Sequence, residues 1–218
     1  MGAQMISINS AQNLYWLGRY IQRVETIAKE CIKSFDYIID KDFDDGKKLF
    51  EKLSADIEYK DEKEFLKEAV FGEHGSSIYA SMFAMKENAV ICRAQIYSSA
   101  FAYLNTAYIG VKELRGAPIE VFDLEKLLSN LYALNGMLDS ALLRTDASNF
   151  IEFGKRVERI DLEIRLYDNL NIVLFEIDEL YGVAKLLSKG FEKPSITTDD
   201  KEKLLDLANS LIKAVIKF

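Results

Sequence analysis

Two segments of this chain repeat one pattern of glycine, basic and acidic residues. Positions 13–25 read NLYWLGRYIQRVE, and positions 149–161 read NFIEFGKRVERID. Asn13, Gly18 and Arg23 recur as identical residues 136 positions later, and most other positions pair residues of like character. The spacing within both segments predicts two equivalent helices that place the same polar groups around one shared volume. The fold therefore has to accommodate an internal pseudo-repeat.

Few residues interrupt the helical pattern between and around these segments. The chain of 218 residues contains two prolines and eleven glycines, and residues that favour helices are abundant, which predicts an all-α protein. No stretch rich in proline, glycine or serine separates two halves, so residues 1–218 are expected to form a single domain. We expect one bundle of about six helices, several of them long.

The apolar pattern and its breaks locate these helices. The main helices are expected at 10–40, 77–114, 118–144, 149–189 and 197–218, with short helical pieces at 49–53 and 62–71 in a peripheral, charge-rich stretch. Ser7, Asn9 or Ser10 is expected to cap the first helix, and Thr197 or Thr198 the last one. The helix 77–114 is predicted to be unbroken and to form the spine of the bundle.

Composition and charge argue against several classes of protein. The net charge is −7 with basic residues dispersed along the chain, which disfavours binding to nucleic acid. No apolar run of about 18 residues and no signal-peptide layout is present, so we expect no membrane span and a cytoplasmic location. His74 is the only histidine, which excludes a two-histidine metal site. We predict no metal and no cofactor, although an all-carboxylate magnesium or manganese site stays open.

Polar residues beside the repeated apolar stripes are the candidate site. Gly18, Gln22 and Glu25 follow i, i+4, i+7 spacing. Their counterparts are Gly154, Glu158 and Asp161. Each glycine would let another backbone approach closely, so that the neighbouring polar groups are held partly out of water and need partners. An ordinary structural network at a helix crossing and a ligand site are both consistent with this pattern.

Arginines and a second carboxylate extend this candidate site. Arg23 and Arg159 border the apolar stripes, where they either cover apolar surface or converge on a phosphate or carboxylate ligand. Glu87 lies on a narrow stripe of small residues within 77–114. We expect Glu87 to pair with an arginine of helix 10–40 or 149–189, because a carboxylate among packed helices needs such a partner.

Together these residues resemble the bacterial alpha-E family, a helical family named for a Glu-Arg signature. The family opening NLYWLGRYxERxE is similar to positions 13–25, which include Arg19, Arg23 and Glu25. The late family motif F-x-x-x-G-R-x-x-E-R is similar to positions 150–159. The central family element R-E-N-A-R, followed by an arginine, is similar to Lys86, Glu87, Asn88, Ala89 and Arg93.

This chain departs from the family pattern at several positions. Gln22 stands where the first signature has its glutamate, and Lys86 and Val90 stand where arginines are usual. The lost glutamate disfavours a mechanism that needs two equivalent carboxylates. Glu158 is therefore the stronger site candidate.

The resemblance implies an association with ATP-grasp and transglutaminase-like proteins in peptide or amide-bond formation. Our first hypothesis is a binding or accessory component that holds a peptide, an anionic small ligand or a partner enzyme. Its binding residues would be Arg19, Arg23, Glu25, Glu87, Asn88, Arg93, Glu158, Arg159 and Asp161.

Two alternatives stay open. The first is an enzyme in which Glu158 or Glu87 acts as a general base beside arginines. The second is a purely structural bundle that forms a homodimer through an apolar face of its last helix. The residues of that face are Leu204, Leu205, Leu207, Leu211 and Ile212.

Overall fold

A computed structural model describes residues 6–143, 145–167, 169–188 and 200–216. These residues form ten α-helices and one π-helical turn, and they contain no strand. The elements are α1 (Ile8–Asp40), α2 (Asp45–Lys52), α3 (Glu62–Phe71), α4 (Ile78–Ile91), α5 (Arg93–Ile96), α6 (Ser98–Glu113), α7 (Val121–Ala141), α8 (Asp146–Leu162), η1 (Glu163–Tyr167), α9 (Leu170–Leu187) and α10 (Lys201–Val215). The all-α prediction is confirmed, whereas the expected number of about six helices is wrong.

The predicted spine 77–114 is divided into α4, α5 and α6. The first break follows α4 at Cys92, and the second lies at Tyr97, whose φ of 62° is in the left-handed region. A residue with this φ cannot continue a right-handed helix. No glycine or proline lies between Cys92 and Ser98, so the sequence carries none of the usual signals for these breaks.

The charge-rich stretch after α1 forms part of the core, in contrast to the expected peripheral position. It contributes α2 and α3, and Phe50 and Phe65 from these helices are fully buried. Asp61 caps α3, because its side chain accepts hydrogen bonds from the backbone N–H groups of Lys63 and Glu64. The charged residues of this stretch occupy the solvent side of two amphipathic helices.

The later helices also differ from their predicted bounds. α7 begins at Val121, after Pro118, and a capping box between Glu120 and Asp123 fixes its first turn. The predicted helix 149–189 consists of α8, the π-turn η1 and α9. α10 is capped by Asp200.

Several predicted boundaries lie outside the described residues. They are the helix ends at Arg144, Lys189 and Phe218, and the proposed caps Thr197 and Thr198.

The apolar face of α10, which was the candidate dimer face, packs against another helix of the same chain. On α10, Leu204 and Leu211 are buried, and they pack with α9 in a small apolar cluster. The apolar face of α10 is therefore largely covered by the same chain.

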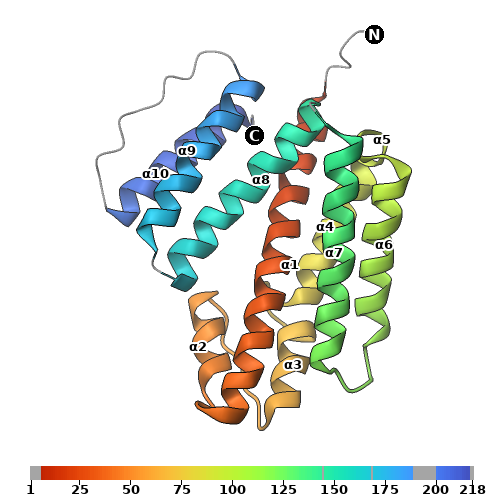
Figure 1. Cartoon of the computed structure of the whole chain (residues 1–218), viewed down its shortest axis with the longest axis vertical. Coiled ribbons are helices and arrows are strands. Elements are labelled where there is room, and N and C mark those ends of the chain that lie inside the picture. Colours follow the sequence, from red (N-terminus) through yellow and green to blue (C-terminus); the bar gives the residue numbers. More distant parts are fainter. Residues whose placement is uncertain (1–5, 144, 168, 189–199, 217–218) are drawn as a thin grey trace.

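The first helix, α1, occupies the centre of the bundle (Figure 1). Of the three candidate caps, Ser7 is the one that caps it, by accepting a hydrogen bond from the backbone N–H of Ser10. α1 packs against α8, α4, α7, α2 and α3, and its residues Leu14, Leu17 and Ile21 are fully buried. α1 rather than 77–114 is thus the spine, and its most extensive neighbour is α8. None of the described helices combines the length and apolarity needed to cross a membrane.

Candidate functional site

The backbones of α1 and α8 touch where the two repeated segments cross. A methyl group added to Gly18 would overlap the carbonyl oxygen of Ile151, and one added to Gly154 would overlap that of Tyr15. Only glycine permits such an approach. The crossing brings Arg19, Gln22 and Arg23 of the first segment close to Glu158 and Arg159 of the second.

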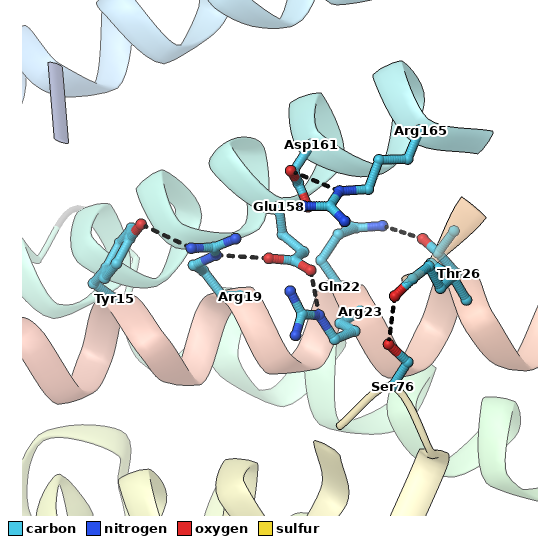
Figure 2. Close-up of polar contacts among 10 residues, drawn as sticks. Tyr15, Arg19, Gln22, Arg23, Thr26, Ser76, Glu158, Asp161 and Arg165 are labelled. Atoms are coloured by element: carbon cyan, nitrogen blue, oxygen red, sulfur yellow. Dashed lines mark hydrogen bonds and ion pairs between the residues drawn. The ribbon is translucent and has the colours of Figure 1, made fainter. Parts of the chain in front are cut away.

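Glu158 of α8 is fully buried between two arginines of α1 (Figure 2). Its Oε2 atom accepts from Arg19 Nε at 2.6 Å, and its Oε1 atom accepts from Arg23 Nε at 2.5 Å. Burial works against the charge of Arg19, but Glu158 beside it raises the pKa of the Arg19 guanidinium. The guanidinium also lies over the Trp16 ring, 5.0 Å from the centroid. Both carboxylate oxygens of Glu158 are therefore occupied by charge-assisted hydrogen bonds.

Gln22 of α1 occupies the matching position on the other side of the crossing. Its Nε2 atom donates to Thr26 Oγ1 at 3.0 Å (Figure 2). Its Oε1 atom accepts from Arg159 Nη2 at 3.0 Å. Arg159 Nη1 also donates to Glu176 Oε1 of α9 at 2.9 Å. A neutral amide thus interacts with Arg159 where a second glutamate would complete the pattern formed by Glu158 and Arg23.

Sequence reasoning missed Glu176, the acidic partner of Arg159. This carboxylate is buried and also accepts from Arg156 Nη1 at 2.9 Å. It lies outside both repeated segments, so the repeat gave no reason to select it. Its position on the buried stripe of α9, between Val173 and Ile177, is the signal that would have found it.

Two predicted residues of the repeated segments lie beside this layer with local partners. Glu25 accepts from Lys29 Nζ at 2.6 Å and from Asn135 Nδ2 at 3.4 Å. Asp161 accepts from Arg165 Nε at 3.1 Å. Glu25 thus links α1 to α7, and Asp161 links α8 to η1. Neither residue joins the Glu158 cluster.

The predicted residues of the central element lie apart from the crossing. Glu87 is 52% exposed and pairs with Lys86 Nζ at 3.1 Å, so its predicted pairing with an arginine of α1 or α8 is wrong. Asn88 donates to the carbonyl of Ala84, one turn earlier. Arg93 is exposed and lies over the Phe101 ring, 5.0 Å from the centroid. α4 turns this polar face toward solvent because its buried face packs on α1.

Lys155 is the buried basic residue of the second segment. The residue is 9% exposed, and it makes no ion pair or hydrogen bond with the described residues. Burial lowers the pKa of its amino group, and the nearby carboxylates of Glu152 and Asp139 only partly oppose this effect. Lys155 occupies the position that corresponds to Arg19, which has Glu158 as its partner.

A polar cavity of about 210 Å³ opens next to the crossing. Its lining residues are Gln22, Thr26, Lys29, Glu30, Lys33, Arg159, Leu162, Glu163 and Tyr167. The cavity receives one side chain from each signature, Gln22 and Arg159, while Glu158 is not among its lining residues. A neighbouring cavity of about 380 Å³ shares Glu30 and extends toward α2.

The π-turn η1 forms one wall of the first cavity. Its first residue, Glu163, has a raised pKa because of burial and the nearby carboxylates of Glu176 and Glu30. The Tyr167 hydroxyl donates to Glu30 Oε1 at 2.6 Å, and burial together with this hydrogen bond raises the pKa of the phenol. Sequence reasoning selected neither residue, because a π-turn has no clear signature in the helical pattern.

Comparison with known proteins places this arrangement in a family context. No curated protein and no solved structure matches the chain. Residues 6–211 match the model of the Alpha-E family, which is described as a predicted alpha-helical domain with a conserved ER motif. The sequence contains one Glu-Arg dipeptide, Glu158-Arg159, and both of its side chains make contacts across the crossing. The match covers most of the sequence, and the chain belongs to the Alpha-E family.

Proposed function

We propose that this chain is a binding component that holds a peptide or a small anionic ligand for enzymes that form peptide or amide bonds. The cavity of about 210 Å³ carries this proposal, because Gln22 and Arg159 bring both repeated segments to its wall. Lys29 and Lys33 also line it, and their side chains are 44% and 63% exposed. Such amino groups can reach a carboxylate or phosphate of a bound ligand.

The internal pseudo-repeat is part of this proposal. Gly18 contacts Ile151 and Gly154 contacts Tyr15, and the residues of these two pairs are related by the same offset of 136 positions. The contacts of Arg23 with Glu158 and of Arg159 with Gln22 follow the same relation. This exchange of partners supports two equivalent helices that cross about an approximate twofold axis.

Binding is better supported than catalysis by the two glutamates that sequence reasoning selected as bases. Glu158 is fully buried, and each of its oxygens accepts from an arginine. A general base has to reach the proton that it removes. Glu87 is exposed beside Lys86 and away from the cavity. Glu158 is therefore better placed to hold α1 and α8 together than to remove a proton. Glu87 is not among the residues that line the cavity.

Calorimetric titration tests the ligand-binding role. We would titrate the protein with a panel of dipeptides, tripeptides and inorganic phosphate, and compare wild type with the double variant Lys29→Gln/Lys33→Gln. Each lost charge-assisted contact weakens binding by about tenfold or more. The matched control is Lys126→Gln/Lys185→Gln, which removes two exposed charges outside this cavity. Absence of binding to wild type, or an equal loss in the control, would overturn the proposal.

Affinity capture tests the partner proteins. By family resemblance, we propose ATP-grasp and transglutaminase-like proteins as partners and the cytoplasm as the compartment. The tagged chain, crosslinked in cells of its source organism, is expected to recover at least one protein of these two classes. Recovery of neither class, in an experiment where the tagged chain itself is recovered intact, would contradict this part of the proposal.

A further inference from the structure

The polar cavity beside Arg159 has one charged lining residue that lacks an ionic partner. The ion pairs of the others are Lys29–Glu25 at 2.6 Å, Lys33–Glu30 at 2.6 Å and Arg159–Glu176 at 2.9 Å. Glu163 makes no ion pair or hydrogen bond with any described residue. The uncompensated charge of the cavity wall is therefore negative, although cations outnumber carboxylates among its lining residues.

The surroundings of Glu163 favour a cation from outside the protein. The charged and titratable groups around it are Lys29, Glu30, Lys33, Arg159, Tyr167 and Glu176. Burial and the carboxylates of Glu176 and Glu30 disfavour the ionised form of Glu163, and Arg159 offsets only part of this effect. A positive group that entered the cavity would relieve this repulsion.

A second acceptor faces the same cavity. Oε1 of Glu30 accepts from both Lys33 Nζ and the Tyr167 hydroxyl at 2.6 Å. Its Oε2 atom accepts no hydrogen bond from the described residues. Glu163 and Glu30 thus offer carboxylate oxygens from two elements, η1 and α1, which matches a group that carries several donors.

The π-turn provides the wall that holds Glu163 in place. Lys52 Nζ of α2 donates to the carbonyl oxygen of Leu166 at 3.0 Å, and Tyr167 is tied to Glu30. These two contacts attach η1 to α2 and α1. Single π-turns inside helices occur frequently at functional sites.

We propose that Glu163 binds the protonated primary amine of a peptide ligand, with Oε2 of Glu30 as a second acceptor. This inference rests on the proposed peptide-binding function and names the part of the peptide that enters the cavity. An ammonium group has three donors, and two carboxylates satisfy two of them. Lys29 and Lys33 at the same cavity can contact the peptide carboxylate. The ligand class is therefore a peptide with a free primary amine.

Titration of matched peptides tests this inference. Each peptide that binds wild type is compared with its N-acetylated form, on wild type, Glu163→Gln and the control Glu125→Gln, an exposed carboxylate of α7. Acetylation removes the positive charge and is expected to weaken binding to wild type and to the control by about tenfold or more. Glu163→Gln is expected to bind the free peptide as weakly as wild type binds the acetylated one.

Stability and pH provide readouts that separate binding from folding. Glu163→Gln removes an unpaired carboxylate, so its thermal midpoint should equal or exceed that of wild type. Affinity for the free-amine peptide should fall as pH drops through the pKa of Glu163, which lies above the ordinary value of 4.5. Equal binding of free and acetylated peptides would overturn the inference and leave the proposed function intact. Failure of every peptide to bind wild type would overturn the inference, and failure of inorganic phosphate as well would also overturn the proposed function.

Discussion

Glu158 is the residue on which the α1–α8 crossing depends most. Glu158→Gln keeps the shape of the side chain but leaves Arg19 and Arg23 without their carboxylate. Loss of one partner of a buried pair costs about 3–5 kcal/mol, and partial exposure of the arginines reduces this to about 2–3 kcal/mol. Urea unfolding measures the change, with the exposed pair Lys47–Glu58 tested by Glu58→Gln as control. Equal stabilities of the two variants would contradict this account.

Gln22 is a position where the chain can be stabilised. Gln22→Glu would replace a neutral acceptor of Arg159 by a carboxylate, and Thr26 can still donate to it. We expect the free energy of unfolding to increase by about 1 kcal/mol, the usual difference between a charge-assisted and a neutral hydrogen bond. Gln22→Met, which removes both hydrogen bonds, should decrease it. A destabilised Gln22→Glu protein would show that Glu176 already satisfies Arg159.

We expect Lys155 to destabilise the fold near neutral pH, because the residue is largely buried and makes no ion pair with the described residues. Lys155→Met keeps the length of the side chain, and we expect it to stabilise the protein by about 1–2 kcal/mol at pH 7. The exposed Lys185→Met is the control. A lower stability of Lys155→Met at pH 7 would mean that the amine has a stabilising partner.

The pH dependence of this effect follows from the lowered pKa of Lys155. Burial lowers this pKa below its ordinary value of 10.5. Between the two values the unfolded chain binds more protons than the folded one, so the stability of wild type rises with pH in that window. The advantage of Lys155→Met is therefore full below the lowered pKa and shrinks as the pH approaches 10.5. Unfolding curves at pH 7, 9 and 10 measure this trend.

At the scale of elements, the close approach of α1 and α8 makes their glycines irreplaceable. Gly18→Ala would push a methyl group into the Ile151 carbonyl, a backbone atom that cannot move aside without separating the helices. We expect a loss of about 2–3 kcal/mol, as in overpacked cores. Gly136→Ala in α7 has open space around it and should instead gain about 1 kcal/mol through helix propensity. Two variants of equal stability would exclude such a backbone contact.

The helical class was predictable from sequence, but several element boundaries were not. Scarce breakers and a long apolar stripe are local signals, and they indicated α1 and limited its cap to three residues, of which the structure selects Ser7. The break at Tyr97 depends on a left-handed φ in a residue type that rarely adopts it. No local sequence pattern signals this conformation.

In the candidate site, the sequence pointed to residues inside the two repeated segments and missed residues outside them. The repeat led us to select Glu158 and Arg23 separately, and the structure shows that they contact each other across the crossing. It could not indicate Glu163 or Glu176, since these carboxylates depend on the π-turn and on the docking of α9. The predicted pairing of Glu87 with an arginine was wrong, because small residues around a charge occur on exposed faces as well as at helix contacts.

At the scale of the whole molecule, two apolar clusters meet at α8. The larger one surrounds α1 and includes side chains of α2 to α7, and the smaller one joins α8, α9 and α10. Tyr15 of α1 belongs to the smaller cluster and lies 6.0 Å from Phe153 of α8, ring centre to ring centre. The cavity lies beside this junction, so movement of α8 against α1 would alter the cavity and both clusters together.

The two apolar clusters predict that α1 and α10 open at different free energies. α1 is covered by helices on several sides, whereas α10 packs chiefly on α9 (Figure 1). Regions with fewer buried contacts open at lower free energy than the global unfolding. Native-state hydrogen exchange should therefore show α10 amides opening at a free energy several kcal/mol below that of α1 amides. Leu211→Ala, which truncates a buried contact of α10, should accelerate exchange in α10 and leave α1 unchanged. Equal acceleration in both helices would mean that the two clusters unfold as one unit.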